Sequence, residues 1–401
     1  MKVYFDNAAT TPIRKEVIDL MSDSMLSVYG NPSSTHGFGR SAKSSIENAR
    51  KSISKLLNCD PQEIIFTSGG TESDNSILSC VVRDLGVKKI ISSPIEHHAV
   101  LETLEDLKMK DTEVHLIDLE DNGLPKISSL EKLLSADDSM KLVSLMHINN
   151  EIGNIIDLHL IGNITKTYGA LFHSDAVQGI GHFKYDLNTL PVDFLSASGH
   201  KFHGPKGVGF SFIRKNLGLD AFIFGGPQER GLRAGTEAVH NIIGMEKAFE
   251  IAYKNFKEEK DYTLKLKKYF IEQIKDFFPE AHFNGLCEDL NLSTYTIVNV
   301  ALPLDVNKLQ LIDFHMDLNG IACSKGSACQ AGASGGSHVL ERLERTEQIK
   351  NRPSIRFSFS SFNTKNEIDY AIRVLAELKS VSYTHLRAHE TVLDLVCRLL
   401  L

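Results

Sequence analysis

The stretch SASGHKFHGPKGVGF, residues 196–210, decides how the fold of this chain is interpreted. It continues an apolar strand around Phe194 and Leu195 and then becomes polar, with Lys201 standing between His200 and His203. Glycines follow, and they allow the backbone to turn sharply and to approach another group closely. A lysine that leaves a buried strand at such a turn is a candidate Schiff-base nucleophile, because desolvation and neighbouring cations lower its pKa. The alternative is a solvated surface lysine.

Strands alternate with helices on the N-terminal side of this stretch. Helical patterns separate most of the strands that we predict, at residues 63–66, 89–91, 114–117, 142–146 and 170–172. This alternation predicts an α/β fold with a mainly parallel sheet covered by helices on both faces. Ligands of such sheets bind outside the carboxyl ends of the strands. Polar clusters stand at these ends: TSGGT at 67–71, EHH at 96–98, HINNE at 147–151 and HSD at 173–175.

The length of 401 residues is too great for one ordinary core, so we expect two domains. A long charged helix at 254–278 marks the boundary, and the part beyond it is typical of a smaller α+β domain. We expect a large domain at 16–255 and a small domain made of 1–15 and 256–380. The N-terminal segment joins the small domain because it is extended and precedes the first helix of the large one.

The composition is that of an ordinary globular protein, with 42% hydrophobic and 24% charged residues. A net charge of -7 gives no reason to expect direct binding of nucleic acid or of an anionic membrane. No apolar run approaches the roughly 20 residues of a membrane helix, and the N-terminus has no apolar signal core. The six cysteines form no CxxC pair, which favours reduced thiols in a cytoplasm. We expect no metal site.

The TSGGT cluster joins a predicted strand to a helix start. Backbone N–H groups, hydroxyls and the positive end of the helix dipole make an anion site there, although the lysine of a P-loop is missing. The alternative is an ordinary capped helix.

Asp175 and His97 are candidates for positions close to Lys201. Asp175 ends a strand 26 residues before Lys201, so one β-α-β step would put both on neighbouring strand ends. A carboxylate there could keep a heterocyclic nitrogen protonated, as in pyridoxal phosphate enzymes; the alternative is a helix N-cap. His97 could lie against a ring and move protons near neutral pH, or it could be structural.

Cys329 lies in the Gly/Ser-rich segment SKGSACQAG, residues 324–332, where a thiol can be exposed and can travel. Four other cysteines have the context of structural residues: Cys59, Cys80, Cys287 and Cys323. Arg356 alternates with apolar residues, and it could bind a substrate carboxylate bidentately or form a structural ion pair.

Taken together, these motifs resemble the class V pyridoxal-phosphate family, specifically the cysteine desulfurases of iron–sulfur cluster assembly. The resemblance runs from about residue 4 to 378 and rests on these motifs: YFDNAATTP at 4, TSGGTES at 67, EHHAV at 96, HINNEIG at 147, SDAVQ at 174, SGHKFHGPKG at 198, ERGLRAGTE at 229 and GSAC at 326. It implies a fold-type I pyridoxal 5'-phosphate (PLP) transferase with a mainly parallel seven-stranded sheet and a smaller α+β domain.

The resemblance also implies a role for each site residue. Lys201 would form the Schiff base and move protons, Asp175 would pair with the pyridine nitrogen, and His97 would stack on the ring. The remaining implied contacts are Gly70, Thr71, Ser198 and His200 on the phosphate side, Asn150 and Gln178 beside the ring, and Arg356 with Asn150 for the substrate carboxylate. Thr236 would reach the phosphate of the other subunit, which implies an obligate homodimer.

The implied reaction converts L-cysteine to L-alanine and leaves a persulfide on Cys329. The sulfur would pass to an iron–sulfur scaffold protein, a transfer-RNA thiolation enzyme or a sulfur carrier. The alternatives are a selenocysteine lyase, another class V aminotransferase, or a non-catalytic protein that binds a partner through the same fold.

Three features depart from the family. Ser360 and Ser361 stand where many members have an arginine or a small-residue pair late in the strand. Gly70 stands where the family often has alanine, and we expect the missing methyl to be tolerated. From about Ser382 the sequence SYTHLRAHETVLDLVCRLLL has no resemblance to the family. We expect residues 382–401 to be a non-native tail in which Cys397 has no function.

Overall fold

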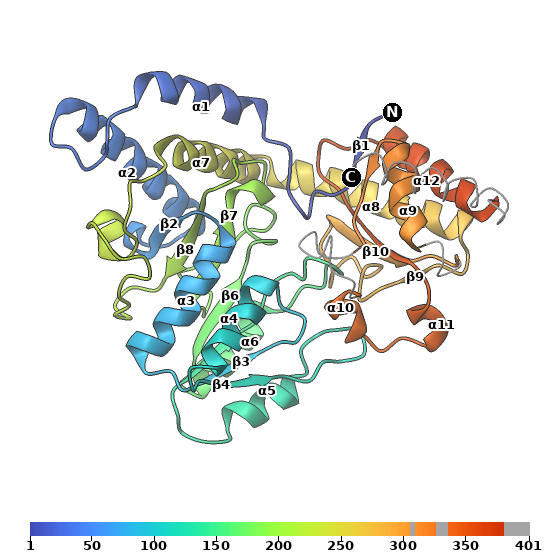
Figure 1. Cartoon of the computed structure of the whole chain (residues 1–401), viewed down its shortest axis with the longest axis horizontal. Helices are drawn as coiled ribbons and strands as arrows, with labels where there is room; N and C mark the ends of the chain where they lie inside the picture. Colours follow the sequence, from blue (N-terminus) through green and yellow to red (C-terminus); the bar gives the residue numbers. More distant parts are fainter. Residues whose placement is uncertain (305–308, 326–335, 381–401) are drawn as a thin grey trace, which may run out of the picture.

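The computed structural model describes residues 1–304, 309–325 and 336–380 (Figure 1). Within them the largest sheet has seven strands in the order β2 (Ile64–Thr67), β8 (Gly209–Ile213), β7 (Phe194–Ser198), β6 (Leu171–Asp175), β5 (Lys141–Ser144), β3 (Lys89–Ser92) and β4 (Glu113–Leu116). All point the same way except β8, which is antiparallel to both β2 and β7. The mainly parallel α/β sheet predicted from the sequence is therefore confirmed.

Strand β8 was not predicted, because its first residue, Gly209, was counted among the glycines that allow the backbone to turn. The turn at 199–208 reverses the chain, so β8 runs back beside β7 with Ser198 opposite Gly209. Glycine is required at 209 because a Cβ there would lie 2.3 Å from the carbonyl oxygen of Ala197 and 2.7 Å from Gly69 Cα. The close approach brings the end of β7 next to the start of α3.

Helices cover both faces of this sheet. On one face, α3 (Gly70–Leu85) and α4 (His98–Lys108) bury an apolar cluster that includes Ile77, Val81 and Leu104. The other face packs against a larger cluster that includes residues of α1 (Lys15–Ser27), α2 (Gly37–Leu57), α5 (Ile127–Leu134), α6 (Leu158–Thr167) and α7 (Val239–Lys254). Burial on both faces explains why these strands are apolar without alternation.

A second sheet lies beside the first and has its own core. Its strands are antiparallel, in the order β12 (Ser354–Ser358), β10 (Ile297–Ala301) and β9 (His282–Phe283). The apolar cluster around it includes residues of α8 (Phe256–Phe277) and α12 (Lys365–Ser380), and α9 (Leu309–Leu318) packs against α12. Phe5 belongs to the same cluster, and β1 (Val3–Tyr4) pairs with β11 (Ile321–Ala322). The remaining helices are α10 (His338–Glu341) and α11 (Glu347–Lys350), with short 3-10 turns η1 (Pro61–Glu63), η2 (Gly199–Lys201) and η3 (Gln228–Gly231).

The charged helix predicted at 254–278 is confirmed as α8, and α7 directly precedes it. Asn255 ends α7 and begins α8, with φ -93° and ψ 5°, so the chain bends where it leaves the large sheet for the second one. The domain limits at residues 15 and 255 stay a prediction. None of the helices in the described residues is long and apolar enough to cross a membrane.

Candidate active site

A cavity of about 210 Å³ opens at the carboxyl ends of the parallel strands. Its lining residues are Ala8, Ala9, Gly70, Thr71, Asp74, His97, Met146, Asn150, Asp175, Val177, Gln178, Ser198, His200, Lys201 and Arg356. Ten of the twelve residues singled out from the sequence are among them. Thr236 is exposed and does not line the cavity, and Cys329 lies outside the described residues.

Lys201 ends η2, the short turn that follows β7. Its Nζ donates hydrogen bonds to the carbonyl oxygens of Ala8 at 2.6 Å and Ala9 at 3.0 Å. Two backbone carbonyls from the N-terminal segment therefore hold the ammonium group at the cavity wall. The sequence did not predict this contact, because nearly 200 residues separate the partners.

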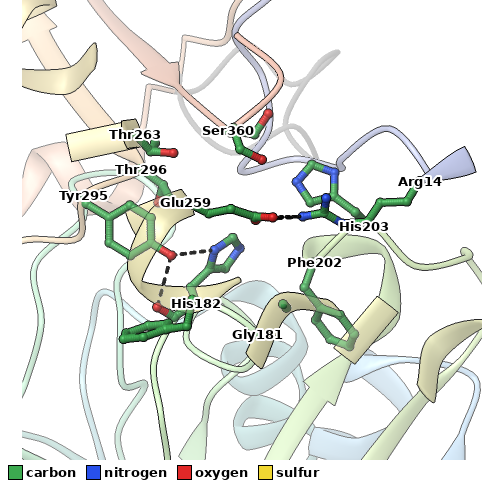
Figure 2. Close-up of a pocket in the computed structure, with 13 residues that line it drawn as sticks. Arg14, Gly181, His182, Phe202, His203, Glu259, Thr263, Tyr295, Thr296 and Ser360 are labelled. Carbon is green, nitrogen blue, oxygen red and sulfur yellow. Dashed lines mark hydrogen bonds and ion pairs between the residues drawn. The ribbon is translucent and has the colours of Figure 1, made fainter. Parts of the chain in front are cut away.

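A second, smaller cavity of about 20 Å³ lies near Lys201 (Figure 2). His182 Nε2 donates to the carbonyl oxygen of Lys201 at 2.9 Å, and His182 Nδ1 lies 3.3 Å from the Tyr295 hydroxyl. In the same cavity Arg14 forms a 2.7 Å ion pair with Glu259. The contact with His182 holds the backbone at Lys201, while the Lys201 side chain lines the larger cavity.

Asp175 is the last residue of β6, beside Ser196 of β7, so the expected neighbouring strand ends are confirmed. The connection differs from the expected β-α-β step, because residues 176–193 contain turns and bridges but no helix. Asp175 Oδ1 accepts from the Val177 N–H at 2.9 Å, which caps a turn instead of a helix. Burial, and then the nearby Asp74, raise the pKa of Asp175 to about 6.

Asp74 is a cavity residue that the sequence analysis missed. It is 1% exposed, its Oδ1 has no hydrogen-bond partner in the described part of the chain, and His173 Nε2 lies 3.4 Å from that oxygen. Burial raises the pKa of Asp74 to about 7. A signal was present, because Asp74 precedes Ile77, Leu78 and Val81 on the buried stripe of α3, where a carboxylate is out of place.

His97 is the N-cap of α4, and it also lines the cavity. The structural role that the sequence left open is therefore present together with the position in the cavity. Its Nδ1 accepts from the Ala99 N–H at 3.1 Å. A neutral His97 therefore carries its proton on Nε2. Burial lowers the pKa of His97, which favours this neutral form at pH 7.

The start of α3 forms a cradle with room for an anion. Gly69 has φ +151°, which strongly favours glycine, and the first N–H groups of a helix have no partner inside it. Thr71 and Ser198 bring hydroxyl groups to the same cavity. His200 joins them, with its Nδ1 3.0 Å from Thr10 Oγ1, and burial lowers its pKa to about 4. This wall offers neutral donors and a helix dipole to an anion.

Arg356 lies on β12 and is only 1% exposed. Its Nη1 donates to the carbonyl oxygen of Asn150 at 2.8 Å, and its Nη2 donates to Asp6 Oδ1 at 2.7 Å. The residue thus forms an ion pair and also lines the cavity, so the two alternatives from the sequence are not exclusive. Gln178 is held similarly, with its Nε2 donating to the Ala8 carbonyl at 2.9 Å.

Four of the cysteines lie in the described residues, and all are free thiols. Burial raises the pKa of Cys59 and Cys323 to about 12, that of Cys80 to about 11, and also that of Cys287. The raised pKa values keep these four thiols protonated at neutral pH, so they are poor nucleophiles.

The aminotransferase class-V family profile matches residues 3–371. The chain belongs to this family. It is 39% identical to cysteine desulfurase IscS of Dictyoglomus turgidum, covering 95% of this chain and 96% of the relative, and 40% identical to cysteine desulfurase IscS of Pseudomonas putida strain GB-1, covering 94% and 92%.

Solved structures agree with the assignment to the class V family. A NifS-like protein matches with a TM-score of 0.86 and 37% identity, covering 95% of this chain and 100% of that one. A NifS-like protein from Rickettsia africae matches with a TM-score of 0.84 and 31% identity over the same shares. Class V enzymes depend on PLP, and this chain is a PLP-dependent enzyme with the fold-type I architecture.

The residues present fit PLP. The start of α3 suits a phosphate, because the first N–H groups of the helix and the hydroxyls of Thr71 and Ser198 meet at this cavity. Asp175 supplies a buried carboxylate for a ring nitrogen, and Lys201 supplies the amine that an aldehyde requires. These three groups line one cavity, as the cofactor demands.

Proposed function

We propose that this chain is a PLP-dependent cysteine desulfurase that converts L-cysteine to L-alanine and takes the sulfur as a persulfide on Cys329. The observation that carries the proposal is one cavity lined by Lys201, Asp175, an anion cradle and Arg356. That set suits a cofactor phosphate, a pyridine nitrogen and an amino-acid carboxylate together. The similarity to relatives named as cysteine desulfurases supports the choice of substrate.

Each residue of the cavity would have a role in binding the cofactor or in moving a proton. Bound PLP supplies an electron sink for the carbanion that forms when an amino acid loses its α proton. Asp175 holds a proton at the ring nitrogen, and Lys201 both anchors the cofactor and moves the α proton. Gly70, Thr71, Ser198 and His200 hold the phosphate, while the neutral His97 packs on the ring and Gln178 contacts its edge.

Arg356 and Asn150 would fix the substrate carboxylate. Nη1 and Nη2 of Arg356 each carry two N–H bonds, and Asn150 and Asp6 use one on each, so among the described residues one on each remains for a ligand. Two parallel donors on a guanidinium match a carboxylate bidentately. This would orient the substrate amine toward Lys201.

Cys329 would take the sulfur atom. An S–S bond forms between its thiolate and the substrate sulfur, the Cβ–S bond breaks with its electron pair staying on Cβ, and a proton then completes alanine. The raised pKa values of the four described cysteines argue against any of them in this role.

We further propose a cytoplasmic homodimer that passes the sulfur to an iron–sulfur scaffold protein or another acceptor. Thr236 is exposed on a single chain, as a residue that completes a partner's phosphate site would be. The net charge of -7 argues against direct binding of nucleic acid.

The test is turnover of L-cysteine by the PLP-loaded protein, with alanine and reducible sulfur measured separately. Wild-type protein should release both in equal amounts. Cys329→Ser should keep the cofactor absorbance and lose turnover, while the matched control Cys59→Ser keeps both. Desulfuration by Cys329→Ser at the wild-type rate would refute the assignment of the nucleophile.

Two further measurements distinguish the alternative functions. Amino-group transfer to 2-oxo acids, unaffected by Cys329→Ser, would identify an aminotransferase. A much higher kcat/KM for selenocysteine than for cysteine would identify a selenocysteine lyase.

A further inference from the structure

Arg356 is already paired with a carboxylate of this chain. Asp6 Oδ1 accepts from its Nη2 at 2.7 Å, and the arginine and aspartate side chains are 1% and 19% exposed. Arg356 Nε has no hydrogen-bond partner in residues 1–304, 309–325 and 336–380. The carboxylate of Asp6 is therefore the negative charge that balances this buried cation.

The backbone around Asp6 holds that carboxylate in place. Asp6 bridges Ser358 in parallel, two residues along β12 from Arg356. The Ala8 N–H donates to Ser358 Oγ at 2.8 Å, and Asn7 Nδ2 donates to the Ser358 carbonyl at 2.8 Å. These contacts hold the backbone of Asp6 against β12, within reach of Arg356.

A substrate carboxylate that binds Arg356 must therefore share the guanidinium with Asp6. Two carboxylates close together in a buried site repel each other much more strongly than in water. Asp6 orients Arg356 through its hydrogen bond, but its charge opposes the binding of a second anion. These two effects act on substrate affinity in opposite directions.

We propose that Asp6 is a positioning and specificity-determining residue. It orients the guanidinium of Arg356 and lowers the affinity of Arg356 for amino-acid carboxylates, so that the product dissociates. The proposal rests on the proposed role of Arg356 in binding the substrate carboxylate. It assigns the N-terminal segment a part in the reaction beyond closing the cavity wall.

Asp6→Asn and Asp6→Ala separate the two effects. Asparagine keeps an oxygen that can accept from Nη2 but has no charge, whereas alanine removes both. Asp19→Asn is a matched control, because Asp19 is 59% exposed and forms an ion pair with Lys15 one turn away. The dissociation constant of L-alanine is read from the absorbance of the PLP-loaded protein, with cysteamine as an amine that lacks the carboxylate.

We expect Asp6→Asn to bind L-alanine about 10-fold more tightly and to lower the KM for L-cysteine similarly, with kcat unchanged or reduced. Cysteamine affinity should stay within about 2-fold of wild type. Asp6→Ala should raise the KM, because Arg356 loses its orienting partner. Asp19→Asn should match wild type throughout.

An unchanged or weaker L-alanine affinity in Asp6→Asn would overturn the proposal, since the charge of Asp6 would then have no opposing effect. Equal gains for L-alanine and cysteamine would also overturn it, because the effect would not involve the carboxylate. Failure of the wild-type protein to desulfurate L-cysteine would refute the proposed function instead. The L-alanine comparison needs no turnover and still decides the role of Asp6.

Discussion

Asp74 and Asp175 place two carboxyl groups in one buried cavity. Burial raises the pKa of Asp74 to about 7 and that of Asp175 to about 6, from the ordinary value of 3.8. Between about pH 4 and pH 7 the folded protein without cofactor therefore holds protons that the unfolded chain has released. Stability falls as the pH rises through this window, because the folded state binds more protons.

Replacing Asp74 with asparagine removes its share of this effect. We compare the free energy of unfolding of the Asp74→Asn variant with that of wild type, both without cofactor. The difference, variant minus wild type, should rise by up to about 4 kcal/mol between pH 4 and pH 8. Urea unfolding at several pH values measures it. The control Asp106→Asn, at an exposed ion pair with Lys110, should show no such trend. A pH-independent difference for Asp74→Asn would contradict the account.

At the scale of elements, the start of α3 meets the turn after β6. Val177 Cγ2 occupies the space that a methyl group at position 70 would take, at 2.5 Å from an ideal Cβ. The methyl missing from Gly70 is thus replaced by one from Val177. Valine is stiff at χ1, so it cannot easily rotate away.

Gly70→Ala should overpack this contact. We expect a loss of about 1–3 kcal/mol in the free energy of unfolding, together with weaker PLP binding. Val177→Ala removes the opposing methyl, so the double variant should be more stable than the sum of the single effects. Chemical denaturation of the four proteins measures the coupling. Additive effects would show that the two side chains do not compete for space.

The elements also show what the sequence could and could not reveal. Apolar runs that end in polar clusters correctly predicted the positions of β2, β3, β5 and β6. Because the carboxyl ends of parallel strands meet at one edge of the sheet, the same pattern also predicted that Asp175, His97 and Lys201 lie close together. Strand β8 was hidden by its glycine. Asp6 and Arg356 are separated by 350 residues in the sequence, and no local sequence pattern predicts a contact at such a separation.

At the scale of the whole molecule, the cavity depends on both sheets and on the N-terminal segment. Thr11 donates from its N–H and hydroxyl to the His200 carbonyl at the end of the large sheet, while Asn7 and Ala8 bind Ser358 of the second sheet. Among the described residues, all the predicted site residues except Thr236 line the cavity of a single chain. Thr236 is exposed instead. The proposed homodimer would account for this exception.

Mixed dimers test that explanation. Lys201→Ala and Thr236→Val homodimers should both be impaired. A heterodimer of the two should recover about half of the wild-type activity, because the intact Thr236 of one subunit completes the site that contains the intact Lys201 of the other. Differently tagged subunits, purified as the mixed species, provide the measurement. Activity no higher than that of the Thr236→Val homodimer would place Thr236 in its own subunit's site or in none.

The central claim is that Lys201 holds PLP in this cavity. Borohydride reduction of the PLP-loaded protein, followed by peptide mass spectrometry, tests it most directly. The account predicts one pyridoxyl adduct on the peptide that contains Lys201, lost in Lys201→Ala and kept in Lys206→Ala, where the neighbouring lysine is exposed. An adduct on another lysine, or none in a protein that has bound PLP, would contradict the account.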